Sequence, residues 1–226
     1  FSDYRAEIRE FYESESYTPA WFRGAAATPH ALAFIALFRN AASQGLRPED
    51  YDSPRWMGRL TRLRQIRPLP TDSDWARFDV AVTVSAMRYV SDLTRGRVNP
   101  PPLQFGLEIN HEINGLGEIL RQRLLAAPDV GAALEQLEPP FPAYRRTVNA
   151  LETYSKLVRE DDGEPLPVPS KSVKPGDLYA GVPRLVRLLR LVGDLPADAV
   201  VPADGATYDA TLAGAVKRFQ IRHGLE

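Results

Sequence analysis

The sequence predicts an all-helical protein on two observations. Apolar residues recur at steps of three and four through several long segments, whereas the alternation typical of half-buried strands is nearly absent. Prolines and glycines separate these segments and indicate where each helix begins or ends. With 44% hydrophobic and 25% charged residues over 226 positions, the chain has the composition of a folded globular protein with a substantial core.

The first strongly patterned helix runs through ALAFIALFRNAA. Thr28-Pro29 places a capping hydroxyl before a proline at the first helical position, and Gly45 follows the end of the pattern. Apolar side chains nearly encircle this helix, which indicates burial on several sides. We therefore expect Phe34, Leu37 and Phe38 in the core rather than in a binding stripe.

Ser53-Pro54 opens the next helix in the same way, with an apolar face and an arginine-rich face. The apolar face holds Trp56, Leu60, Leu63 and Ile66, and the opposite face holds Arg55, Arg59 and Arg62. These arginines could bind polyanions or peptide carboxylates through forked hydrogen bonds. A solvated amphipathic face explains them equally directly, and we prefer that interpretation.

A helix over residues 74–93 has the clearest period and is expected to be the central packing element; its inward positions are Trp75, Phe78, Val82, Ala86, Tyr89 and Leu93. Two shorter helices are expected over 114–126 and 128–137. A long helix follows and ends at Asp161-Asp162; the residues aligned on its face are Tyr144, Val148, Leu151, Ser155 and Val158.

Residues 161–176, DDGEPLPVPSKSVKPG, are rich in proline and lack a helical period, so they are predicted to be an extended linker. The linker divides a helical domain, residues 1–160, from a small piece, residues 177–226. Two helices are expected in that piece: the first has Val182, Leu185, Leu189 and Val192 inward, the second Leu212, Ala215, Val216 and Phe219. About fifty residues is near the lower limit for independent folding, so the piece is expected to pack on the first region or to be cut short.

Charge and composition exclude several function classes. The 28 lysines and arginines nearly balance the 29 aspartates and glutamates, which argues against nucleic acid as a partner. The chain has no cysteine, and therefore no thiolate nucleophile or thiolate metal ligand. No apolar run reaches the length of a membrane span, and the charged start FSDYRAEIREFY is not a signal peptide.

The histidines and the first glutamates receive structural interpretations. His30, His111 and His223 lack the local spacing of a metal site, so neither a metal nor a cofactor is predicted. His223 is suited to the carbonyl groups at a helix C-terminus. The glutamates Glu7, Glu10 and Glu13 lie at helical spacing, which is compatible with a muramidase acid only if an apolar cleft encloses one of them. A solvated charged face is preferred.

The last fifty residues carry a more specific pattern. Gly193-Asp194-Leu195 ends the first helix of the piece, and AVKRFQIRHGL, residues 215–225, forms most of the second. Gly224 supplies the left-handed residue that ends this helix, while Val216 and Phe219 face inward. These features resemble the peptidoglycan-binding domain of wall hydrolases and transpeptidases. That family continues with a further turn and a third helix, so the domain is expected to be incomplete here.

Four stretches of the first domain resemble the helical scaffold domain of large YkuD-type murein L,D-transpeptidases. They are FYESESYTPAWF at 11–22, ASQGLRPEDY at 42–51, MRYVSDLTRGRVNP at 87–100 and LEQLEPPFPAYRRT at 134–147, and KPGDLYAG follows in the same order.

The resemblance implies an enzyme of the bacterial envelope or periplasm that cross-links peptidoglycan through a catalytic cysteine in a downstream domain. This chain holds no such cysteine, so no catalytic residue is transferred to it and it is expected to be the non-catalytic part that positions the enzyme on peptidoglycan. Its implied partners are peptidoglycan and the downstream catalytic domain. The wall-contacting residues predicted by type are Arg187, Arg190, Tyr208, Lys217, Arg218 and Gln220. A protein-interaction scaffold and a helical muramidase remain the alternatives.

Overall fold

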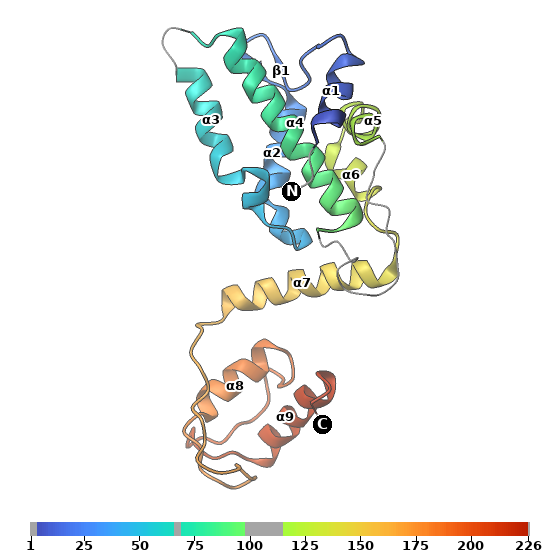
Figure 1. Ribbon diagram of the computed structural model, residues 1–226. Helices are drawn as coiled ribbons and strands as arrows, with labels where there is room; N and C mark the ends of the chain where they lie inside the picture. Colours follow the sequence, from blue (N-terminus) through green and yellow to red (C-terminus); the bar gives the residue numbers. More distant parts are fainter. Residues whose placement is uncertain (1–3, 66–68, 98–114, 226) are drawn as a thin grey trace. The chain divides into compact units, whose positions relative to one another are not determined.

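The computed structural model describes residues 4–65, 69–97 and 115–225, which fall into two compact units, residues 1–148 and 149–226. Within these ranges the regular structure is helical, α1 to α9 with a few 3₁₀ and π turns, apart from one two-stranded hairpin (Figure 1). The predicted all-α class is confirmed. No described helix combines the length and the apolar composition needed to cross a bilayer.

A short hairpin follows α1 (Arg5–Glu13), and no sequence pattern predicted it. Its strands are β1 (Phe22–Arg23) and β2 (Ala26–Ala27), paired antiparallel with Phe22 opposite Ala27. Gly24, at φ +56°, adopts the left-handed conformation that the tight turn requires. Two residues per strand are too few for alternation to show in the sequence.

The next helix, α2 (Pro29–Arg39), begins as predicted and ends earlier. The Thr28 hydroxyl accepts a hydrogen bond from the Ala31 amide at 3.2 Å, so the cap is confirmed. The expected helix through Ala42 is too long, because α2 ends at Arg39 and a 3₁₀ turn, η1 (Ala41–Gln44), follows it; Gly45 ends that turn at φ +71°. A second 3₁₀ turn, η2 (Pro48–Tyr51), leads into α3 (Ser53–Gln65).

The longest helix, α4 (Asp72–Arg95), contacts α1, α2, α3, α5 and η2, so its predicted central place is confirmed (Figure 1). It begins two residues before the predicted start, at a capping box in which Thr71 and Asp74 bond each other's backbone amides. The six predicted inward residues of α4 are all buried.

The short helices after α4 differ in detail from the prediction. The first is α5 (Leu116–Glu118), which passes directly into a π-helical segment, η4 (Ile119–Leu125); Asn114 and His111 lie outside the described residues. Gly117 allows α5 to approach α1, since a Cβ there would lie 3.3 Å from the Cβ of Phe11. The second helix, α6 (Val130–Glu135), is shorter than predicted at both ends.

The core of the first unit is aromatic. The ring of Phe38 lies within 5.8–6.1 Å of the rings of Phe34, Tyr51, Trp56 and Tyr89. Phe34 and Phe38 are fully buried as predicted, but the prediction for Leu37 is wrong: it is only partly buried against this core.

The helix α7 (Pro142–Glu160) contains the boundary between the two units and has no fully buried residue. Four of the residues predicted to share a face, Tyr144, Val148, Leu151 and Ser155, are half-buried. The fifth, Val158, is 75% exposed, so the predicted face does not extend to the end of the helix.

The second unit contains α8 (Val182–Leu191) and α9 (Ala210–Arg222), which pack against each other. It has a buried core of its own; the described residues in it are Val182, Val186, Leu189, Leu195, Leu212 and Ala215. Four predicted inward residues, Leu185, Val192, Val216 and Phe219, are only partly buried, and Val186 was missed. Residues 176–179 pair with residues 206–208 through backbone hydrogen bonds. The Gly176 amide donates to Tyr208, the Tyr208 amide to Asp177, and the Tyr179 amide to Ala206.

Candidate functional site

A buried polar cluster fixes the FYESESYTPAWF stretch to α4. The carboxylate of Asp79, only 2% exposed, accepts hydrogen bonds from the Tyr12 hydroxyl at 2.6 Å and from the amides of Ala20 and Trp21 at 3.2 and 2.7 Å. The Trp21 indole N–H donates to Thr83 Oγ1 at 2.8 Å. Burial, and then the negative charge of Asp79, raise the pKa of Tyr12, so its hydroxyl stays a donor. The cluster joins two segments that are distant in sequence.

A second cluster joins two more of the motif stretches. The Tyr51 hydroxyl donates to Asp92 Oδ2 at 2.8 Å, Arg88 donates to the Asp50 carbonyl at 2.7 Å, and the Arg97 guanidinium pairs with the Asp50 carboxylate at 2.6 Å. Burial raises the pKa of Asp92, while the hydrogen bond from Tyr51 opposes that shift. The stretches 11–22 and 42–51 of the scaffold resemblance are therefore held against α4 by specific polar contacts.

Described residues of the stretches 42–51, 87–100 and 134–147 line an open groove of about 710 Å³ at one end of α4. Its described lining comes from three places: Gln44 and Leu46, residues 92–96, and residues 137–141 with 143–144. The Tyr144 hydroxyl donates to the Gln44 side chain at 3.2 Å across this region. Burial, and then the nearby Glu135, raise the pKa of Glu138. The groove thus combines apolar walls with partly desolvated carboxyl groups.

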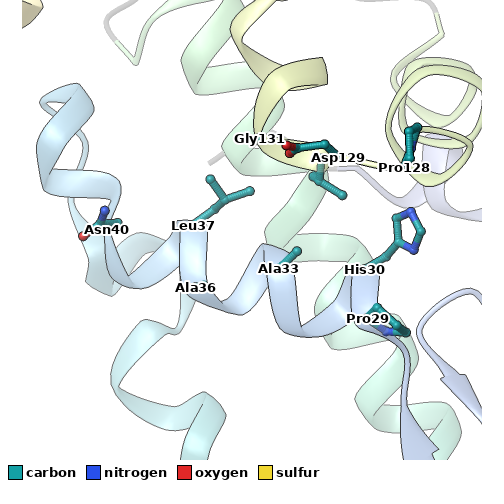
Figure 2. Close-up of a pocket in the computed structure, with 10 residues that line it drawn as sticks. Pro29, His30, Ala33, Ala36, Leu37, Asn40, Pro128, Asp129 and Gly131 are labelled. Carbon is teal, nitrogen blue, oxygen red and sulfur yellow. The ribbon is translucent and has the colours of Figure 1, made fainter.

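A second groove, of about 520 Å³, lies between α2 and the start of α6 (Figure 2). One wall is the face of α2 with His30, Ala33 and Leu37, and the other is the turn at Pro128 and Asp129. Leu37, which the sequence pattern predicts to be in the core, therefore lines a surface groove.

A third cavity, of about 320 Å³, shares His30 with the α2 groove and is the polar site that sequence reasoning missed. Its charged lining residues are Glu15, Arg23 and Arg121. These residues come from the end of α1, the hairpin and the π-helical segment, so no local motif indicates the cavity.

In the second unit, the two family-like motifs meet at the end of α8. Gly193, at φ +82°, ends α8, and the Asp194 amide donates to the Leu189 carbonyl at 2.8 Å. The buried Asp194 carboxylate accepts from Arg222 of α9 at 2.5 Å. Gly224 is left-handed at φ +65° as predicted, and the Leu225 amide closes the same kind of turn on the Gln220 carbonyl at 2.9 Å.

The six predicted wall-contacting residues make separate contacts within the second unit. Arg187 pairs with Asp162 at 2.5 Å, Arg190 donates to the Ala199 carbonyl at 3.2 Å, and Arg218 donates to the Asp194 carbonyl at 2.9 Å. Lys217 and Gln220 are exposed on α9. Tyr208 is half-buried against the core, and this burial raises its pKa. Their role in wall binding stays a prediction.

The other candidates from the sequence take the following places. His30 Nε2 lies 2.9 Å from the Ala127 carbonyl, the His223 ring contacts the Phe219 ring in a tilted arrangement, and the described residues contain no cluster suited to a metal. Glu10 and Glu13 are exposed, and Glu7 is half-buried. On α3, Arg55 and Arg59 pair with Asp52 at 3.0 and 2.7 Å, so their charges are partly satisfied within the protein.

The fold and these contacts define a class: an all-helical scaffold unit followed by a small helical unit with its own core. A family model described as "Scaffold domain" matches residues 6–151, more than half of the chain. The chain therefore belongs to the Scaffold domain family. Searches of curated proteins and of solved structures find no match.

Proposed function

We propose that this chain is the non-catalytic part of a murein L,D-transpeptidase, acting in the periplasm or cell envelope, and that it positions the catalytic domain on peptidoglycan. The Scaffold domain match over residues 6–151 supports the identity of the first unit at family level. Beyond the family, we propose that the parent protein is a transpeptidase, that its partner is the wall, and that its catalytic cysteine lies outside this chain.

The observation that carries the proposal is the Asp194–Arg222 contact. The Gly193-Asp194-Leu195 turn and the AVKRFQIRHGL helix are the two motifs of the peptidoglycan-binding resemblance, and this ion pair and the Arg218 bond to the Asp194 carbonyl join them. Leu195 is buried in the core beside Leu212. Direct contacts between the residues of the two motifs support the proposal that both motifs belong to one module.

The exposed cations of this module are suited to wall ligands. Peptidoglycan combines sugar rings with peptide carboxylates, for which an exposed arginine or lysine and a partly exposed aromatic ring are appropriate contacts. Arg190, Lys217 and Tyr208 retain some solvent exposure. Association is expected to be weak and salt-sensitive, because single exposed charge contacts are screened at physiological ionic strength.

The direct test is co-sedimentation of the chain with purified insoluble sacculi at micromolar protein. We expect the protein in the pellet, and expect the double variant Arg190→Gln/Lys217→Gln to shift several-fold toward the supernatant. The matched control is Arg39→Gln/Arg64→Gln, which removes the same charge from exposed positions of α2 and α3.

A chain that stays in the supernatant but binds the separate catalytic domain tightly would instead make it a protein-interaction scaffold. Release of soluble muropeptides by this chain alone would support the muramidase alternative. Glu10 and Glu13 are exposed and lack the apolar enclosure that a general acid needs, which leaves the half-buried Glu7 as the glutamate for that role.

A further inference from the structure

The cavity of about 320 Å³ in the first unit is lined by the Arg121 side chain, whose Nε has only a weak contact among the described residues. Arg121 is 26% exposed, and its contact with Glu15 is a long 3.5 Å ion pair through Nε. Nε is shielded from solvent without a hydrogen-bond partner among the described residues. Because Nε is shielded and lies beside Glu15, a ligand in the cavity reaches Arg121 through the exposed part of its side chain.

A second guanidinium faces the same cavity and is held by the hairpin backbone. Arg23 Nη1 donates to the carbonyl oxygens of Pro19 and Phe22, which fixes the side chain on the hairpin. Within the described chain its Nε and Nη2 make no hydrogen bond. The side chain is thus ordered in advance, and less conformational entropy is lost when it binds an anion.

The remaining lining provides a neutral donor and an apolar wall. Thr28 Oγ1 accepts from the Ala31 amide, which leaves its hydroxyl hydrogen available to donate. Phe11, Ala20 and Leu125 supply apolar surface, with the Arg121 guanidinium 5.6 Å from the centre of the Phe11 ring. Arg121 and Leu125 project from a π-helical segment, a geometry that is frequent at functional sites.

From this lining we propose that the cavity binds the terminal carboxylate of a short peptide. Two arginines and one glutamate give the cavity a net positive lining. A planar guanidinium group can bind a carboxylate through two parallel hydrogen bonds. The apolar wall accepts a small side chain such as that of alanine. The volume suits one or two residues rather than a folded partner. A wall stem peptide as the source rests on the proposed function, whereas the carboxylate site itself does not.

Isothermal titration of the full chain at low salt tests the proposal, with N-acetyl-D-Ala-D-Ala and its C-terminal amide as probes. We expect the acid to bind at least tenfold more tightly than the amide. Arg121→Met, which keeps an unbranched apolar stem, should weaken binding of the acid at least tenfold, and Arg23→Gln several-fold. The control Arg64→Gln, at an exposed position of α3, should bind as the parent does, and unchanged circular dichroism confirms folding of each variant.

N-acetyl-L-Ala-L-Ala distinguishes the two sources of such a carboxylate. Preference for the D-peptide supports a wall stem peptide, and preference for the L-peptide supports a protein C-terminus at the same site. Equal binding of acid and amide, no heat at millimolar peptide, or an unaffected folded Arg121→Met variant would overturn the proposal. Sacculus co-sedimentation, measured separately, shows whether the proposed function fails independently of this site.

Discussion

The hydroxyl of Tyr12 donates to the carboxylate of Asp79 at 2.6 Å, although 67 residues separate them in sequence. The same carboxylate accepts the backbone amides of Ala20 and Trp21. One buried acidic residue of α4 therefore fixes both α1 and the segment that enters the hairpin. The hairpin carries Arg23, so this cluster also determines the position of one wall of the carboxylate cavity.

Replacing Asp79 should destabilise the first unit strongly. Asp79→Ala removes the acceptor of the Trp21 amide and of the part-buried Ala20 amide, while the Tyr12 hydroxyl keeps Thr83 Oγ1 at 2.7 Å. Each unsatisfied donor costs roughly 1–3 kcal/mol, so we expect a loss of about 3 kcal/mol in the free energy of unfolding. Tyr12→Phe removes one donor and should cost only about 1 kcal/mol. Urea denaturation followed by tryptophan fluorescence measures both. Equal effects of the two variants would show that Asp79 is not the shared anchor.

The raised pKa of Asp92 predicts that the free energy of unfolding falls as the pH rises, and that a variant which cannot ionise is more stable. Burial raises its pKa in the folded protein above the ordinary value, so folding favours the protonated form. The stability it contributes is complete below the ordinary pKa and is lost as the pH rises through the folded-state pKa. Asp92→Asn cannot ionise, and its side-chain oxygen can still accept from Tyr51.

The Asp92→Asn variant should therefore be more stable than the parent at pH 7. Its advantage should shrink as the pH is lowered toward the ordinary aspartate pKa of about 3.9. Denaturation curves of both proteins between pH 4 and pH 7 provide the comparison, in which the other titrating groups cancel. An advantage that is constant across this range would contradict the assigned pKa shift.

Arg184 should restrain the proline-rich segment. Its guanidinium binds Asp161 at 2.7 and 3.0 Å and Asp162 at 2.7 Å, and its Nε donates to the Glu164 carbonyl at 2.6 Å. The start of the predicted linker, residues 161–176, thus contacts α8 within the second unit. The domain boundaries at residues 160 and 177, which were placed by this linker, stay a prediction.

Arg184→Ala should release this segment and expose it to protease. Endoproteinase Lys-C cleaves after lysine, and Lys171 and Lys174 are both exposed in the segment. We expect cleavage there to become several-fold faster, with Arg190→Ala as the control on the same helix. An unchanged cleavage rate would show that the Arg184 contacts do not order the segment.

Local signals in the sequence predicted much of the fold. The Thr28 cap, the buried period of α4, and the left-handed Gly224 each follow from a few adjacent residues, whose preferences do not depend on distant contacts. The hairpin and the π-helical segment were missed, because two-residue strands and a local change of helical pitch leave no period to detect.

The carboxylate cavity could not be predicted in the same way. Arg23 and Arg121 are nearly a hundred positions apart, and each alone is typical of a solvated surface. Their meeting depends on the Asp79 cluster and on the close approach of α5 to α1 at Gly117. Leu37 was misplaced for a related reason: an apolar residue on a largely apolar helix does not reveal whether a groove or a neighbouring helix faces it.

The separate cores of the two units give a decisive test of where wall binding resides. Leu212 is fully buried in the small core of the second unit, so Leu212→Ala should cost roughly 2–5 kcal/mol. A unit of this size has little stability in excess, so the variant should unfold it and abolish sacculus binding.

All three tryptophans, Trp21, Trp56 and Trp75, lie in the first unit, so their fluorescence should stay native. Val200→Ala, at a site 86% exposed, is the matched control and should bind normally. If sacculi still retain the Leu212→Ala protein after its second unit has unfolded, the wall-binding surface belongs to the first unit, and the carboxylate cavity becomes the first place to locate it.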